Sequence, residues 1–80
     1  MNKNEFKYEI INHIGVISQN NTWNKELNRI SWNGLEPKYD IRDWSDNHEK
    51  MGKGITLTEE ELRSLKKVID NEIELLDSEI

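Results

Sequence analysis

The chain of 80 residues contains no cysteine, so it can form neither a disulfide bond nor a metal site built on thiolates. The absence of cysteine also favours a reducing compartment, and we expect a cytoplasmic protein. No apolar run approaches the roughly 18 residues of a membrane span, and the N-terminal residues lack the apolar core of a signal peptide. The length is that of one domain, residues 1–80, which excludes a multi-domain enzyme.

Net charge is confined to one part of the chain. Residues 1–57 contain eight basic and eight acidic residues, whereas residues 58–80 contain three basic and eight acidic residues and carry the whole net charge of −5. The acidic average therefore does not exclude a nucleic-acid partner, provided that one face of the first 57 residues gathers the lysines and arginines.

Four stretches within about residues 5–57 have the patterns of β-strands. In the first, Phe6, Tyr8 and Ile10 alternate, and the alternation loses phase at Ile11 before Gly15, which predicts a bulge. The expected strands are residues 6–17, 23–32, 38–44 and 55–57. Turns are expected at the polar cluster 18–21, at the hairpin signal Asn33–Gly34, at 45–48 and at the glycine-rich stretch 51–54.

The last segment predicts one long helix over about residues 59–79. Thr58 and Glu61 form the pattern of a capping box, and no glycine or proline interrupts the segment. One apolar stripe runs along it: Leu62, Leu65, Ile69, Ile73 and Leu76. A helix of about 33 Å is too long for one small sheet to cover. We therefore expect the stripe to form a homodimer interface, with a monomer that has a frayed acidic end as the alternative.

Groups suited to catalysis or metal binding are few. His13 and His48 are the only histidines, and no zinc motif, nucleophile motif or phosphate-binding loop is present. We expect His13 to be a strand residue with a hydrogen-bonded ring and His48 to lie in a solvated turn. The sequence thus predicts a protein that is not an enzyme, with no catalytic residue, no metal site and no cofactor.

Three tryptophans are interleaved with basic residues in the second and third expected strands. Lys38, Arg42 and Trp44 share one face of the third strand, and we expect at least one tryptophan, with Trp44 as the first candidate, to be exposed on this basic face. The opposite face of that strand is expected to pack on the helix. Aromatic rings beside lysine and arginine on a sheet suit single-stranded nucleic acid, because bases stack on the rings and cations follow the phosphates. Burial in the core remains the alternative for each tryptophan.

The two tryptophans of the second strand are expected on opposite faces of the sheet. Trp23, Lys25 and Arg29 share one face, and Trp32 falls on the other. The glycines that flank Lys53 either admit a phosphate to the backbone or form an ordinary turn.

Two segments together resemble the positive cofactor four family of single-stranded DNA-binding transcriptional coactivators, and more closely its bacterial YdbC-type branch. They are Tyr39-Asp40-Ile41-Arg42-Asp43-Trp44 and Met51-Gly52-Lys53-Gly54-Ile55-Thr56-Leu57-Thr58. Two further segments look like that branch: His13-Ile14-Gly15-Val16 and Ser31-Trp32-Asn33-Gly34. The resemblance covers about residues 5–70.

The resemblance implies an α+β fold, in which a strongly curved four-stranded antiparallel sheet is followed by one long helix and two copies pair through their helices. It implies that Arg42 and Lys53 contact the phosphate backbone of single-stranded DNA. It also implies that Trp32 and Trp44 lie where the family carries base-stacking aromatics. The matches of Lys25, Arg29 and Lys50 to basic positions of the family are approximate.

Together these observations predict a non-enzymatic, nucleoid-associated homodimer that binds single-stranded DNA with little sequence preference, in transcription regulation or in DNA replication and repair. RNA and the transcription machinery are further partners to consider. The expected interface consists of Trp23, Lys25, Arg29, Trp32, Lys38, Arg42, Trp44, Lys50 and Lys53. The substitution Arg42→Ala is expected to weaken DNA binding without unfolding the dimer. The competing hypothesis is a protein–protein adaptor that docks a partner on the acidic helix and binds no nucleic acid.

Overall fold

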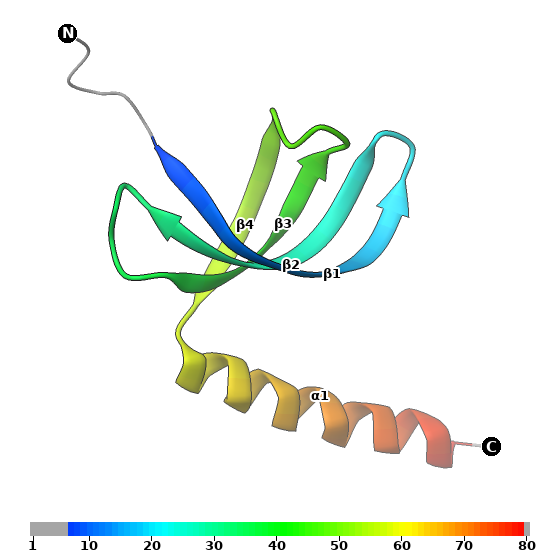
Figure 1. Ribbon diagram of the computed structural model, residues 1–80. Coiled ribbons are helices and arrows are strands. Elements are labelled where there is room, and N and C mark those ends of the chain that lie inside the picture. The colour runs from blue at the N-terminus through cyan, green and yellow to red at the C-terminus, as the bar shows by residue number, and fades with distance from the viewer. Residues whose placement is uncertain (1–6, 80) are drawn as a thin grey trace, which may run out of the picture.

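A computed structural model describes residues 7–79 of the chain, which form one antiparallel sheet followed by one helix (Figure 1). The elements are β1 (Tyr8–Asn20), β2 (Trp23–Trp32), β3 (Lys38–Ser45), β4 (Met51–Leu57) and α1 (Glu59–Ser78). The strands are neighbours in the sheet in chain order, β1-β2-β3-β4. The α+β class and the element order that the sequence predicts are therefore confirmed.

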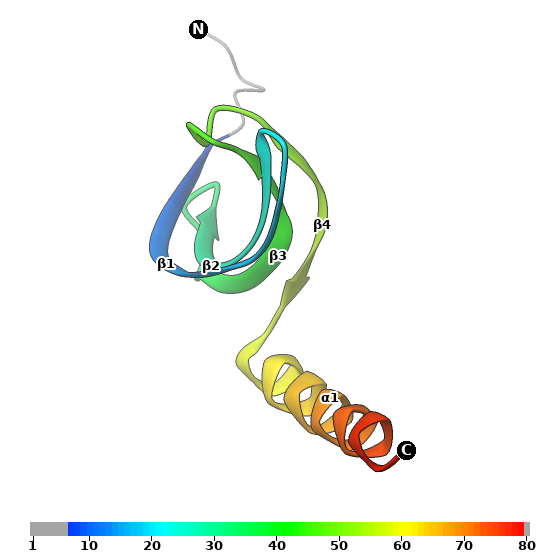
Figure 2. The ribbon, with the colours of Figure 1, turned by 90° about the vertical axis from the view of Figure 1, so that its right-hand side faces the viewer.

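The sheet curls into an open half-barrel, and α1 lies on its convex side (Figure 2). The curvature coincides with three register shifts between β1 and β2, at Ile10/Asn12, His13/Gly15 and Val16/Ser18. Each shift is a bulge or irregularity of the ladder, and a bulge bends the strand and increases its twist. The bulge predicted near Ile11 is confirmed, and two further shifts follow it.

Two strand boundaries differ from the prediction by three residues or more, and β3 extends one residue further than predicted, to Ser45. Residues 18–20, expected in a turn, belong to β1, where Ser18 pairs with Lys25 and Asn20 with Trp23. Only two residues remain for the turn, and Asn21 takes the left-handed φ of 58° that asparagine tolerates. At the other edge of the sheet, β4 begins at Met51 instead of Ile55. Phe6 lies outside the described residues.

The two faces of the sheet differ sharply in burial. Even-numbered residues of β2 and β3 point into the concave side, here called the inner face, and include the fully buried Ile30 and Trp44. Odd-numbered residues point to the convex side, here called the outer face. The buried part of the inner face is unusually polar, since Glu26, Asn28 and Asp40 are each at most 1% exposed. Buried polar groups require hydrogen-bond partners, so the inner face is a bonded network of side chains.

The helix begins where the capping box predicts. The Thr58 hydroxyl accepts a hydrogen bond from the Glu61 N–H at 3.1 Å, and the Glu61 carboxylate accepts one from the Thr58 N–H at 2.9 Å. Leu62, Leu65 and Ile69 face an apolar strip of the outer face across a groove. The strip consists of Ile17, Leu27, Tyr39 and Ile41. The helix therefore lies on the predicted side of β3, but a groove separates the two apolar surfaces.

The far half of the helix has no such neighbour among the described residues. Ile73 is 48% exposed and Leu76 is 56% exposed, and no residue of α1 is buried. Within residues 7–79, no helix combines the length and the apolar character needed to cross a membrane.

Candidate nucleic-acid interface

The inner face gathers three aromatic rings and one arginine. The guanidinium carbon of Arg42 lies 4.7 Å from the centroid of the Trp32 ring, a separation suited to a cation–π contact. Tyr8 joins the two tryptophans of this face, with ring centroids 5.8 Å from Trp32 and 5.4 Å from Trp44. Because the sheet curls, Trp32 at the end of β2 reaches Arg42 in the middle of β3. Trp32 therefore shares a face with Lys38, Arg42 and Trp44.

Arg42 is engaged by the protein itself. Its Nε and Nη2 donate to the two carboxylate oxygens of Asp40 at 2.6 and 2.7 Å, and its Nη1 donates to the Gly52 carbonyl at 3.3 Å. The side chain of Arg42 is 14% exposed and that of Asp40 is fully buried. A guanidinium held in this way fixes the Trp32 ring and has few donors left for a phosphate. The geometry thus favours a positioning role for Arg42.

Trp44 lies on the predicted face but is not exposed there. Its exposed fraction is 0%, with Tyr8 on one side and His48 at a centroid distance of 5.4 Å on another. The prediction that Trp44 is exposed beside Arg42 is therefore wrong. The strand phase was right, but the curvature of the sheet turns this face inward and the loop that carries His48 covers the ring.

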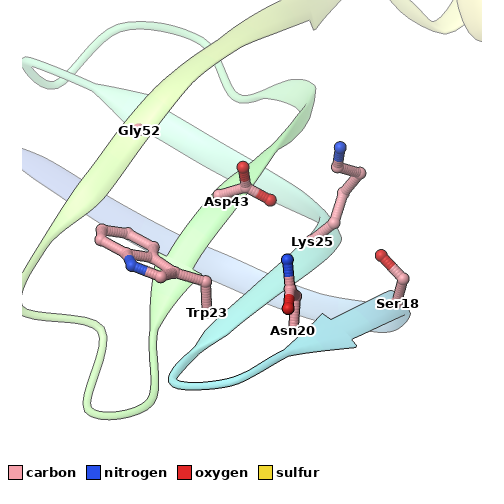
Figure 3. A pocket seen from close by; sticks show the side chains of 6 residues that line it. All are labelled: Ser18, Asn20, Trp23, Lys25, Asp43 and Gly52. Carbon is pink, nitrogen blue, oxygen red and sulfur yellow. The ribbon is translucent and has the colours of Figure 1, made fainter.

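The outer face holds the second cluster of the predicted site. Trp23, 38% exposed, and Lys25 line a shallow hollow on β2, as Figure 3 shows. The remaining lining residues are Ser18, Asn20, Asp43 and Gly52. Arg29 is half-buried further along the same face of β2. The nine predicted residues are therefore split between the two faces, as the alternation of β2 predicts, and do not form one patch.

Three exposed lysines lie on β3, on β4 and in the loop between them, and of these Lys38 is in phase with Asp40 on the inner face. Lys50 lines a hollow with Trp23 of the outer face, and Lys53 precedes Gly54, which pairs with Arg42 of the inner face. Lys38, Lys50 and Lys53 are exposed, and no ion pair is recorded for them among the described residues. The stretch around Lys53 is part of β4, so the ordinary turn is wrong as a structural assignment, and the approach of a phosphate to the backbone there stays a prediction. Gly54 has a packing role there, because a Cβ at this position would overlap the Ile41 carbonyl and the Arg42 Cβ.

The two histidines, which the sequence places far apart, meet on the inner face. His13 Nδ1 lies 2.7 Å from Asn28 Oδ1 and 3.5 Å from the Glu26 carboxylate, so its ring is hydrogen-bonded as predicted. His48 Nε2 lies 2.9 and 3.0 Å from the two Glu26 oxygens. The prediction of a solvated turn for His48 is therefore wrong, because the β3–β4 loop folds back over the sheet. No spacing in the sequence signals this cluster.

These features define a class of small α+β domains. Each has one curved antiparallel sheet, an inner face with aromatic and cationic side chains, and a single helix. Residues 19–68, from the end of β1 into α1, match the family of the Transcriptional Coactivator p15 (PC4). An uncharacterized protein of Treponema pallidum (strain Nichols) is 46% identical over 68 residues, which cover 84% of this chain and 80% of that protein. The chain belongs to the PC4 family. The narrower YdbC-type branch stays a prediction.

Proposed function

We propose that the protein is a non-enzymatic homodimer that binds single-stranded DNA with little sequence preference. Membership in a family named for a transcriptional coactivator supports a role at DNA. The observation that carries the proposal is the partly buried Trp32 ring, with the guanidinium carbon of an arginine that Asp40 holds in place 4.7 Å from its centroid. A rigid indole is a platform on which unpaired bases stack, for roughly 1–3 kcal/mol per base.

The proposed path of the strand runs from Trp32 and Lys38 on the inner face toward the sheet edge that carries Lys50 and Lys53. These lysines are exposed and can follow the phosphates, whereas Arg42 is occupied by Asp40. The outer face is the weaker candidate, because the helix lies along its apolar strip. Trp44 supports the platform from the core through its contact with Tyr8. A duplex hides the faces of its bases and is expected to bind less well.

The proposed dimer follows from the exposed apolar residues in the C-terminal half of α1. Ile69, Ile73 and Leu76 are 44–56% exposed, and the groove between α1 and the sheet is apolar. The helix is also uneven in charge, since Arg63, Lys66 and Lys67 lie in its first half and residues 68–80 contain five acids and no base. Two antiparallel helices would bury their stripes and set the acidic half of one against the basic residues of the other.

Tryptophan fluorescence during titration with an oligo-dT of about 20 nucleotides tests the proposal, with the matching duplex alongside. We expect saturable quenching that weakens with salt and favours the single strand. Trp32→Phe should lose most of the quenching. The matched variant Trp23→Phe, on the outer face, should keep it, and Trp44 in the core reports in both variants that the fold is intact.

Each other result points to a different conclusion. Quenching that survives in Trp32→Phe and disappears in Trp23→Phe would move the interface to the outer face. If the intact protein shows neither quenching nor retention of the labelled oligonucleotide at low salt, the DNA-binding proposal is wrong and the adaptor hypothesis takes its place.

A further inference from the structure

Three side chains from three separate elements converge at one point of the inner face: His13 from β1, Glu26 from β2 and His48 from the β3–β4 loop. One potential ligand atom of each lies within 4.8 Å of the others. The measured separations from Glu26 are 3.5 Å to His13 Nδ1 and 2.9 Å to His48 Nε2. In a tetrahedral zinc site, with bonds of about 2.0–2.2 Å, neighbouring ligand atoms are about 3.3–3.6 Å apart. The three groups therefore need little movement to surround one ion.

The charge of Glu26 has no full counter-charge at this point. Its side chain is 2% exposed, and among the described residues its ion-pair partners are the two imidazoles. Arg42 lies opposite Glu26 in the β2–β3 register, but its guanidinium is bound to Asp40. A buried carboxylate requires a cation or several donors. Asn28 Nδ2 supplies one donor to Glu26, at 3.0 Å.

The facing nitrogens carry protons that a metal ion can replace. Asn28 donates its amide N–H to Glu26, so its Oδ1 accepts from His13 Nδ1, and His48 Nε2 donates to the Glu26 carboxylate. On metal binding, each proton moves to the other nitrogen of its ring, or leaves to solvent if the ring is doubly protonated. Both rings reach water, because the His13 side chain is 50% exposed and the His48 side chain 36% exposed. The same opening lets an ion enter and a water molecule fill its fourth position.

We propose that His13, Glu26 and His48 form a binding site for a divalent transition-metal ion of the zinc class. Two imidazoles and one carboxylate are a zinc ligand set with an open position, and imidazole disfavours magnesium and calcium. Asn28 serves as a supporting group that orients the Glu26 carboxylate. The ion would join β1, β2 and the β3–β4 loop, and it would place positive charge beside Trp44 on the proposed nucleic-acid side. The proposal does not depend on DNA binding.

The test uses the full chain without a histidine tag, in the absence of DNA. Titration with Co²⁺ should give the visible absorption bands of a tetrahedral site, saturating at one ion per chain, and Zn²⁺ should displace it. Because the chain has only two histidines, nitrogen-15 NMR of the imidazoles resolves both ligands directly. Both ring signals should shift together with Zn²⁺, and the thermal midpoint should rise with its concentration.

Variants separate a ligand role from a structural one. His13→Gln, at a half-exposed position, is expected to fold and to lose more than about 100-fold in Co²⁺ affinity, since even an outer partner costs roughly 10–100-fold. Glu49→Gln, an exposed carboxylate next to His48, is the control and should bind as tightly as the unmodified chain. Imidazole signals that stay unchanged in millimolar Zn²⁺ would overturn the proposal. So would equal Co²⁺ affinity in His13→Gln, or a stoichiometry that survives loss of both histidines.

Discussion

Arg42 and Asp40 lie two residues apart on β3 and form a two-pronged ion pair on the inner face, with N–O distances of 2.6 and 2.7 Å. The Thr56 hydroxyl of β4 donates to the same carboxylate at 3.3 Å. A fork-on-fork pair fixes the plane of the guanidinium, and that plane supports Trp32. The arginine of the family motif is thus part of the architecture that presents the aromatic ring.

The first prediction concerns this pair. Arg42→Ala should destabilise the fold by about 3–5 kcal/mol, because it leaves the buried Asp40 carboxylate without its cation. The earlier expectation that this variant leaves the fold intact therefore no longer stands. Urea unfolding measures the change. The double variant Arg42→Met with Asp40→Leu should recover most of the loss, since replacing both members of a buried pair is often nearly neutral. Additive losses would contradict the assignment.

The second prediction concerns the close approach of β4 to β3. Gly54→Ala should cost about 1–3 kcal/mol or more, because the new Cβ would overlap the Ile41 carbonyl and β4 would have to move away. Gly15→Ala is the matched control, since a Cβ there meets nothing within 4 Å. Denaturation midpoints of the two variants should differ clearly, and equal midpoints would show that β4 tolerates the displacement.

The third prediction concerns the start of α1. Thr58→Ala should lower stability by about 1 kcal/mol, because it removes the acceptor for the Glu61 N–H. Ser64→Ala, at an exposed position inside the helix, should be neutral or slightly stabilising because alanine is the better helix former. Thermal unfolding followed by circular dichroism compares the two. A Thr58→Ala variant as stable as Ser64→Ala would mean that the cap adds nothing measurable.

The fourth prediction concerns the proposed dimer. Ile73→Asp introduces a charge into the apolar stripe and should convert the dimer to a monomer in light-scattering measurements on a sizing column. Asn71→Asp adds the same charge two residues away, off the stripe, and should remain dimeric. A monomeric mass for the unmodified chain at micromolar concentration would refute the dimer itself.

The fifth prediction tests the proposed path of the strand by salt dependence. The pair Lys38→Gln with Lys53→Gln should reduce the slope of log K against log salt by about 1.4, because each lost phosphate contact changes it by about 0.7 on a single strand. The pair Lys25→Gln with Arg29→Gln removes the same charge from the outer face and should leave the slope nearly unchanged. If the slope changed equally in both double variants, the lysines and arginines would act on the DNA through the overall electrostatic field of the protein. The proposed path of the strand would then be wrong.

The sequence predicted those elements whose signals are local. The strand predicted over residues 23–32 matches β2 residue for residue, and Thr58 with Glu61 marks the helix start. The end of β1 was missed because Ser18, Gln19 and Asn20 have turn composition, and pairing with β2 overrides that preference. The beginning of β4 was missed for the same reason, since glycine there serves a close strand contact and not a turn.

The site was harder to predict because it depends on curvature. Strand alternation correctly divides Trp23 from Trp32, but it cannot show that the face bearing Trp44 is curled inward and buried. Strand alternation already places Asp40 and Arg42 on one face, so their pairing was accessible from the sequence. The meeting of His13 with His48 depends on how far the strands bend. Bulges determine how far β1 bends, and no local sequence pattern predicts how many bulges it contains.

The irregular ladder of β1 has one more consequence, for the behaviour of the chain in a crowded cell. β1 is an edge strand, and Ile11, Ile14, Val16 and Ile17 are each at least 40% exposed on it. A straight strand of this composition would invite another chain to add itself and begin fibrillar assembly. Three register shifts leave its free edge without the even spacing of donors and acceptors that such templating needs. The same bulges that shape the inner face are therefore expected to disfavour pairing of β1 with a strand of another chain.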